Sequence, residues 1–179
     1  MTKNFFMLSK NIPVVKSKLF FKEETILKLS EIKNLKSFHF IGIGGAGMSV
    51  LAKILIESGL TVSGSDRIES TTTEMLKNLG AKIFIGHDAK NISKDLDAIV
   101  YSSAIPQDNP EILRAAELKI PKLHRSDINA WLLNSRKGIA VAGSHGKTTT
   151  TSMIGYVLHS AGVDPTIVIG GESRRHCRE

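Results

Sequence analysis

The stretch HFIGIGGAGMS, residues 39–49, places three glycines at the spacing G-x-G-x-x-G directly after an apolar run. Gly42 allows a tight turn out of a strand, and Gly44 lets a phosphate approach the backbone. We expect Gly47 to let the next helix pack closely on the sheet. The helix N-terminus then presents free amide groups and a positive dipole end to a diphosphate. This stretch therefore predicts a strand, a phosphate-binding turn and a helix.

An acidic residue stands where a nucleotide site needs one. Asp66 ends the stretch VSGSD at residues 62–66, at the end of the second expected strand. A carboxylate at that place accepts hydrogen bonds from ribose hydroxyls. The glycine loop and Asp66 together predict a nucleotide ligand, and a nicotinamide dinucleotide remains open at this point.

Short apolar, β-branched runs alternate with segments of helical periodicity along the chain. The expected strands are residues 38–43, 60–63, 82–85, 98–101, 122–123 and 139–142. The expected helices are residues 46–58, 72–79, 110–118, 126–135 and 147–161, with a further helix near residues 23–32. This alternation predicts an α/β fold with a parallel sheet and helices on both of its faces.

A second glycine-rich loop, GSHGKTT at residues 143–149, follows an apolar run and opens an expected helix. The backbone from Gly143 to Lys147 can wrap phosphates, the Lys147 ammonium can reach the β and γ phosphates, and Thr148 can ligate Mg²⁺. The general pattern G-x-x-x-x-G-K-[ST] has glycine where this chain has Val141. The loop is therefore a shortened form of the phosphate-binding pattern.

The net charge of +7 comes mainly from residues 1–36, which hold eight lysines and three glutamates. The rest of the chain is nearly neutral, and only 6% of all residues are aromatic, which argues against a nucleic-acid surface. No apolar run approaches the ~20 residues of a membrane span. A single cysteine, Cys177, excludes an internal disulfide. We expect a cytoplasmic protein with neither nucleic-acid nor membrane partners.

Several stretches together resemble the amino-terminal part of the Mur ligase family of peptidoglycan synthesis, and within it the ligases that join L-alanine to UDP-N-acetylmuramate. They are HFIGIGGAGMS, VSGSD, LGAKIFIGHDAKNI, YSSAI, GIAVAGSHGKTTTTSMIGYVLHSAGVDPT and a final glycine pair. The resemblance covers about residues 37–171, and the shortened phosphate loop is itself typical of the family.

The resemblance implies a domain organisation. Residues 37–137 would form a Rossmann-like domain that binds the UDP sugar, and residues 138–171 would begin a P-loop central domain that binds ATP. Residues 1–36 would be an amino-terminal extension. The last eight residues, ESRRHCRE at 172–179, depart from the family pattern, and we expect them to mark a truncation.

The resemblance also implies roles for individual residues. The residues implied to contact the diphosphate are Gly42, Gly44, Gly45 and Gly47. Those implied near the uridine are Asp66, His87, Ser102 and Ser103, with Arg125 near the substrate. The residues implied to bind ATP are Gly143, Ser144, His145, Gly146, Lys147, Thr148 and Thr149. Among them Lys147 would be catalytic, and Thr148 would ligate Mg²⁺ that is bound through ATP.

The implied reaction is ATP-driven amide formation. The γ-phosphoryl group passes to the carboxylate of the muramic acid, and the amine of L-alanine attacks the resulting acyl phosphate. Since family members are more than twice as long, we expect this chain alone to be inactive. Two alternatives stay open: a nicotinamide-binding Rossmann protein, which leaves Lys147 without a role, and a nucleotide-binding fragment without enzymatic activity.

Overall fold

The computed structural model describes residues 29–135 and 137–169. The chain divides into two compact units, and the boundary between them falls between Trp131 and Leu132. The expected tail at 172–179 and most of the expected extension lie outside the described residues. Of the helix expected near residues 23–32, the described part is α1 (Leu29–Ile32).

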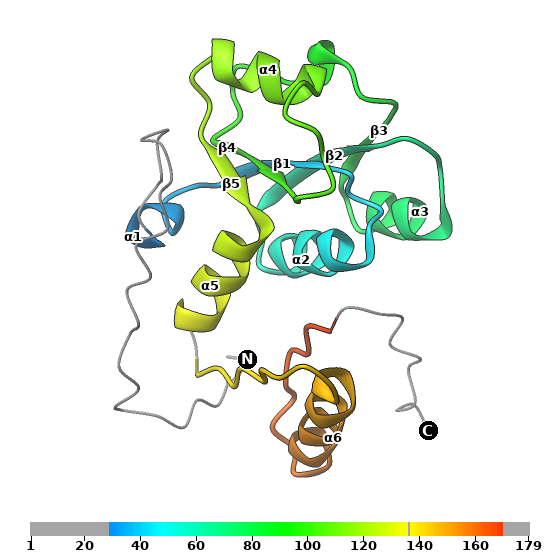
Figure 1. Ribbon diagram of the computed structural model, residues 1–179, viewed down its shortest axis with the longest axis vertical. Coiled ribbons are helices and arrows are strands. Elements are labelled where there is room, and N and C mark those ends of the chain that lie inside the picture. The colour runs from blue at the N-terminus through cyan, green and yellow to red at the C-terminus, as the bar shows by residue number, and fades with distance from the viewer. Residues whose placement is uncertain (1–28, 136, 170–179) are drawn as a thin grey trace. The chain divides into compact units, whose positions relative to one another are not determined.

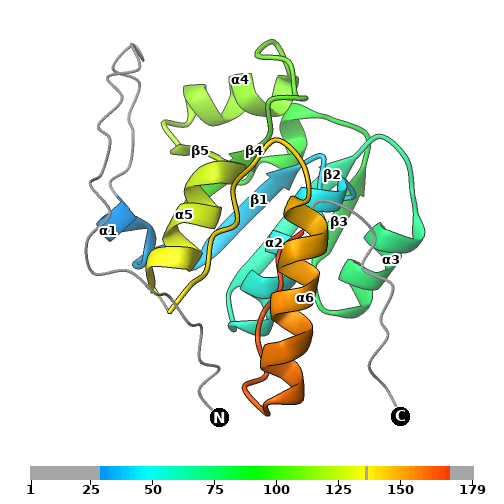
Figure 2. The ribbon, with the colours of Figure 1, turned by 60° about the horizontal axis from the view of Figure 1, so that its bottom comes forward.

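The first unit contains a parallel sheet of five strands (Figures 1 and 2). The strands are β1 (Ser37–Ile41), β2 (Thr61–Asp66), β3 (Lys82–Ile85), β4 (Ala98–Tyr101) and β5 (Lys122–His124). Their order across the sheet is β3-β2-β1-β4-β5, and each neighbouring pair is parallel. The chain moves outward from β1 to β3 and then returns to the other side of β1. Ligands of such sheets bind at the carboxyl ends of the strands, near this reversal.

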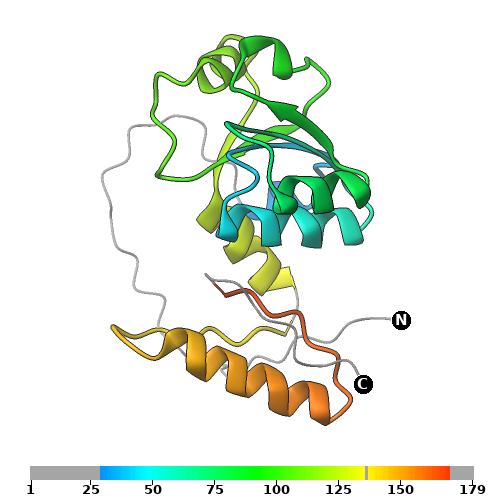
Figure 3. The same cartoon turned by 90° about the vertical axis from the view of Figure 1, so that its right-hand side faces the viewer.

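Helices cover both faces of this sheet, as the alternation predicted. They are α2 (Ala46–Glu57), α3 (Thr71–Asn78), the 3-10 turn η1 (Ala89–Asn91), α4 (Pro110–Glu117) and α5 (Arg125–Ser135). Figures 1 and 3 show α2 and α3 on one face and α4 on the other. Because both faces are covered, β1 is buried from Phe38 to Ile41 and lacks the polar alternation of a half-exposed strand.

The helix starts follow local sequence signals. The Ser70 hydroxyl caps α3 by accepting the Thr73 amide, and the Thr73 hydroxyl accepts the Ser70 amide in return. Asn109 caps α4 and Pro110 occupies its first turn. The apolar face of α4 then packs on the sheet in a cluster of buried side chains: Ile41, Ile92, Ile99, Ile112, Ala115 and Ile120.

The second unit, as far as it is described, holds one helix, α6 (Lys147–Ser160), after the second glycine-rich loop. The strand expected at residues 139–142 is not formed, so that prediction was wrong. A strand needs a hydrogen-bonding neighbour, and no described residue pairs with this segment. Large apolar side chains on α6 are also exposed, namely Met153, Tyr156 and Val157.

Candidate nucleotide-binding site

The first glycine loop leaves β1 in a tight turn, as predicted. Gly42 has a φ of +75°, which favours glycine over any residue with a side chain. Its amide donates to the carbonyl of Ser65 at 2.8 Å, and the Gly45 amide donates to the Gly42 carbonyl at 3.2 Å. The turn therefore closes on itself and is tied to the end of β2.

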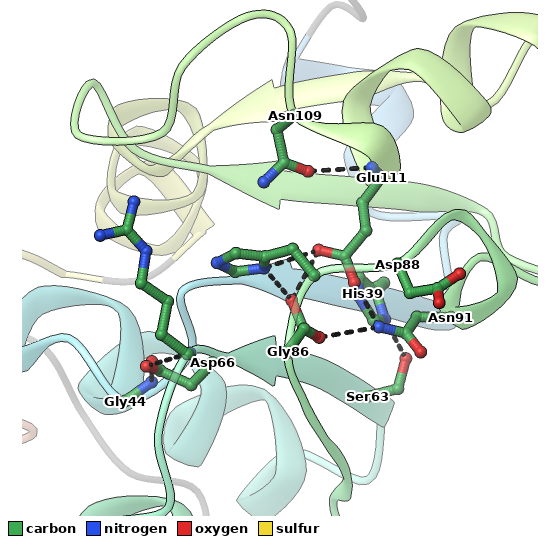
Figure 4. Close-up of polar contacts among 12 residues, drawn as sticks. His39, Gly44, Ser63, Asp66, Gly86, Asp88, Asn91, Asn109 and Glu111 are labelled. Carbon is green, nitrogen blue, oxygen red and sulfur yellow. Dashed lines mark hydrogen bonds and ion pairs between the residues drawn. The ribbon is translucent and has the colours of Figure 1, made fainter.

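Asp66 braces this loop from the end of β2. Its Oδ2 accepts the Gly44 amide at 2.8 Å, and its Oδ1 accepts the Arg67 amide at 2.8 Å (Figure 4). A Cβ atom at Gly44 would lie 2.8 Å from Oδ2 and 3.2 Å from Cγ2 of Thr73. Only glycine leaves room for the carboxylate here, so the spacing of Gly44 and Asp66 has a structural reason within the protein itself.

Gly47 makes room for a guanidinium group. The prediction that this glycine lets α2 pack closely on the sheet was wrong, because a Cβ atom there would overlap Nη1 of Arg125 and meet no strand atom. Among the described residues, the amides of Ala46 and Gly47 have no acceptor. A cation and two free donors thus meet at the N-terminus of α2, where the helix dipole also favours an anion.

The other residues assigned to the UDP sugar lie at the same edge of the sheet. His87 follows β3 by two residues, and Ser102 and Ser103 follow β4 directly. The Ser102 carbonyl accepts the amide of Ile105 at 3.0 Å. Ile105 in turn lies against the glycine loop, since its Cδ1 would be 3.2 Å from a Cβ at Gly42. The fold therefore gathers residues from the ends of all five strands.

A buried carboxylate, which the sequence analysis missed, lies beneath this edge. Glu111 of α4 accepts the Ser65 hydroxyl at 2.6 Å on Oε2 and the Asn91 amide group at 2.7 Å on Oε1. Oε2 also lies 3.1 Å from Nδ1 of His87, and Oε1 lies 3.5 Å from Nε2 of His39. Figure 4 shows the Glu111 side chain pointing toward Asn91 and His39. We call these five residues the Glu111 cluster.

The Glu111 cluster favours the ionised form of the Glu111 carboxyl group. Burial raises the pKa of Glu111, but the nearby His39 and the hydrogen bonds from Ser65 and Asn91 lower it by more, so the pKa lies below its ordinary value. The sequence carried one signal for this acid. Glu111 lies four residues before Ala115, on the buried face of an amphipathic helix where an isolated charge is costly.

The second glycine-rich loop belongs to the other unit. Lys147 folds back so that its Nζ donates to the carbonyls of Gly143 at 2.6 Å and Ser144 at 3.1 Å. Gly146 caps α6 with a φ of +75°, and residues 143–149 are all exposed. Thr148 stands in the first turn of α6, next to the free helix N-terminus. The arrangement fits a phosphate chain, because the amides of that turn and the ammonium face the same loop.

Metal ligands of the usual acidic kind are not gathered in the described part of the chain, which holds no group of three or more His, Cys, Asp or Glu side chains suited to a metal ion. Nor do residues 29–135 and 137–169 contain a helix long and apolar enough to cross a bilayer.

Known proteins match the region of the chain that contains this candidate site. The family model described as "Mur ligase family, catalytic domain" matches residues 37–137. A UDP-N-acetylmuramate–L-alanine ligase from Persephonella marina is 56% identical over 138 residues, which are 77% of this chain and 30% of that protein. The chain therefore spans about a third of the length of the curated relatives it matches.

Solved structures show the same relationship. The crystal structure of a UDP-N-acetylmuramate-alanine ligase from Thermotoga maritima is similar with a TM-score of 0.65 at 39% identity, over 70% of this chain and 30% of that one. A murein peptide ligase from Psychrobacter arcticus also has a TM-score of 0.65, at 32% identity, over 71% of this chain and 27% of that one. The family model matches more than half of the residues of this chain, and the chain shares a parallel sheet with these solved structures. The chain therefore belongs to the Mur ligase family.

Proposed function

We propose that this chain carries the sugar-nucleotide-binding part of a ligase that joins L-alanine to UDP-N-acetylmuramate. In this proposal residues 37–137 bind the UDP end of the substrate, and residues 138–171 begin the ATP-binding domain. The observation that carries the proposal is the guanidinium of Arg125 against Gly47, at a helix N-terminus with free amides. A diphosphate has the charge and the acceptors that this place requires.

Some of the proposed residues contact the ligand, and others position the residues that do. The N-terminus of α2 and Arg125 hold the diphosphate, while Asp66 keeps the glycine loop closed through Gly44. His87, Ser102 and Ser103 line the edge on either side of the loop. Family membership favours this interpretation over a nicotinamide-binding protein, and it also gives the second loop a role.

The second loop is proposed to bind ATP. ATP with Mg²⁺ would supply the phosphoryl group that activates the muramic acid carboxylate for attack by L-alanine. Lys147 would release its two loop carbonyls and neutralise the charge of the β and γ phosphates, and the Thr148 hydroxyl would ligate the metal ion. Gly143, Ser144, His145, Gly146 and Thr149 complete the proposed loop.

Gly44→Val is expected to abolish binding of UDP-N-acetylmuramate. A Cβ at this position overlaps Asp66, so the loop and the carboxylate must separate and the start of α2 moves. Calorimetry should show binding of the UDP sugar to the wild-type chain, weaker or no binding of NAD, and no binding of the UDP sugar to the variant. Binding of NAD without binding of the UDP sugar would contradict the proposal.

The chain is expected to show no ligase activity by itself. Phosphoryl transfer depends on positioning and on neutralisation of charge, and Thr148 is the single proposed metal ligand. The test incubates the chain with ATP, Mg²⁺, UDP-N-acetylmuramate and L-alanine and measures alanine-dependent phosphate release and the amide product. The appearance of both products, with their loss in Lys147→Ala, would show that the chain is a complete enzyme.

A further inference from the structure

We propose that Glu111 is a positioning residue, which holds His87 with a proton on Nδ1 so that Nε2 accepts a hydrogen bond from the nucleoside of the ligand. The inference rests on the proposed UDP site and adds a specific contact to it. The contact is chemically defined, because the nucleoside must supply a donor. Uridine has two kinds of donor, the N3–H of the base and the ribose hydroxyls.

The direction of the hydrogen bonds follows from the carboxylate. An ionised Glu111 accepts only, so the Ser65 hydroxyl donates its one hydrogen to Oε2 at 2.6 Å. The contact between Ser65 Oγ and His87 Nδ1, at 2.9 Å, then requires Nδ1 to donate. Oε2 of Glu111 lies 3.1 Å from Nδ1 of His87 and is a second acceptor for the hydrogen on Nδ1.

The other ring nitrogen is thereby left as an acceptor. A neutral imidazole carries one hydrogen, and with that hydrogen on Nδ1 the lone pair lies on Nε2. The His87 side chain is 14% exposed, whereas Glu111 is fully buried. The exposed edge of the ring is therefore the one that carries Nε2, and no described residue donates to that atom.

The backbone that carries His87 is held by the same cluster. Asn91 donates to Oε1 of Glu111 at 2.7 Å and to the Gly86 carbonyl at 3.1 Å. The Gly86 amide donates to the Asp66 carbonyl at 2.7 Å, which joins the end of β3 to the end of β2. Glu111 thus fixes both the ring of His87 and the turn that precedes it.

The position of His87 relative to the glycine loop selects the nucleoside as the partner. The glycine loop, Asp66 and Gly86 follow the adjacent strands β1, β2 and β3 in that order. A diphosphate at the start of α2 therefore has its nucleoside within reach of the ends of β2 and β3, where His87 stands.

The proton position is measured without any ligand. Long-range ¹H–¹⁵N spectra of the histidine-labelled chain, at a pH where the imidazole is neutral, should show Nδ1 of His87 protonated and Nε2 unprotonated. Glu111→Gln supplies an amide that can itself donate to Nδ1, so the Nε2–H form should appear. Glu117→Gln is the control, because Glu117 lies on the same helix and pairs with Arg114 at the surface. A wild-type His87 with its hydrogen on Nε2 would overturn the proposal.

The nucleoside contact is measured by calorimetry with UDP. His87→Ala and Glu111→Gln should each weaken binding about tenfold, the size expected for one lost hydrogen bond to an aligned partner, and Glu117→Gln should leave it unchanged. N3-methyl-UDP, 2′-deoxy-UDP and 3′-deoxy-UDP identify the donor. The analogue that lacks the donor should bind the wild type more weakly than UDP does, whereas His87→Ala should bind that analogue and UDP equally well.

The outcomes separate this inference from the proposed function. Equal UDP affinity in the wild type, His87→Ala and Glu111→Gln would refute the contact and leave the UDP site standing. If Glu111→Gln is unfolded, the wild-type spectrum and the His87→Ala titrations still decide the question. A folded wild-type chain that does not bind UDP would contradict the proposed function, and the nucleoside contact would fall with it.

Discussion

Glu111→Ala is expected to lower the free energy of unfolding by about 3–5 kcal/mol, because each of two buried hydrogen-bond donors left without its acceptor costs about 1–3 kcal/mol. The truncation leaves the Ser65 hydroxyl and the Asn91 amide group without their buried acceptor, and it removes the carboxylate oxygen that lies 3.5 Å from Nε2 of His39. It also leaves a cavity where the buried side chain stood, which adds to the loss of stability. Urea denaturation followed by circular dichroism and by the fluorescence of Trp131, the only tryptophan of the chain, measures the change.

Glu117→Ala provides the matched control for this measurement. Glu117 ends the same helix, and its carboxylate pairs with Arg114 at 2.8 Å on the surface. Exposed pairs contribute about 0–1 kcal/mol, so this variant should unfold close to the wild type. A similar loss of stability in both variants would mean that helix propensity, and not the buried network, is responsible.

The pH dependence of stability tests the same carboxylate. Because the pKa of Glu111 is lower in the folded chain than in the unfolded one, its stabilising contribution is complete above the ordinary glutamate pKa of 4.5 and is lost as the pH falls through the lowered value. Asp97 behaves likewise, since it accepts the Lys36 and Ser37 amides, which lower its pKa. As the pH falls, the free energy of unfolding of Glu111→Gln should therefore decrease less than that of the wild type. The decrease that remains in this variant should include the contribution of Asp97.

Gly64→Val is expected to destabilise the sheet domain by about 3 kcal/mol, at the upper end of the cost of overpacking. Gly64 is buried in β2, and a Cβ atom there would lie 2.7 Å from the Phe40 carbonyl oxygen and 2.6 Å from Cδ1 of Ile43. The carbonyl belongs to the neighbouring strand and cannot move without disturbing the ladder between β1 and β2. The loss should appear as a lower urea midpoint with an unchanged slope.

The Gly59→Ala variant distinguishes the energetic cost of steric crowding from the cost of backbone conformation. Gly59 has a φ of +82°, and a Cβ atom there would meet nothing within 4 Å, so this variant measures the cost of the left-handed conformation alone, about 1–2 kcal/mol. Gly64 has no positive φ, and its cost comes from contact. A Gly64→Val variant as stable as the wild type would show that β1 and β2 can separate without penalty.

Local patterns in the sequence were sufficient to predict most of the sheet domain. Short apolar, β-branched runs located all five strands of the sheet, and helical periodicity located the helices between them. The G-x-G-x-x-G spacing predicted the tight turn at Gly42, because a turn that leaves a strand with positive φ requires glycine at that place. These features depend on neighbours within a few residues, so a single sequence is enough to find them.

Other predictions failed because they depended on distant partners. The run at residues 139–142 has the composition of a strand, yet strand formation requires a neighbouring strand, which the described residues do not supply. The role of Gly47 was assigned to contact with the sheet, whereas the group that needs the space is Arg125, 78 residues away in the sequence. Composition and spacing contain no information about such a pairing.

The sequence by itself determined an α/β chain with two glycine-rich loops and a family resemblance that the comparisons confirmed. Only the tertiary structure decided how β1 stands between β2 and β4, which places the ends of five strands at one edge. It alone brought Glu111 under His87, together with Ser65, Asn91 and His39 from separate segments. The reason is that burial and hydrogen bonding over tens of residues are properties of the folded chain, and no local pattern in the sequence pairs Glu111 with these four side chains.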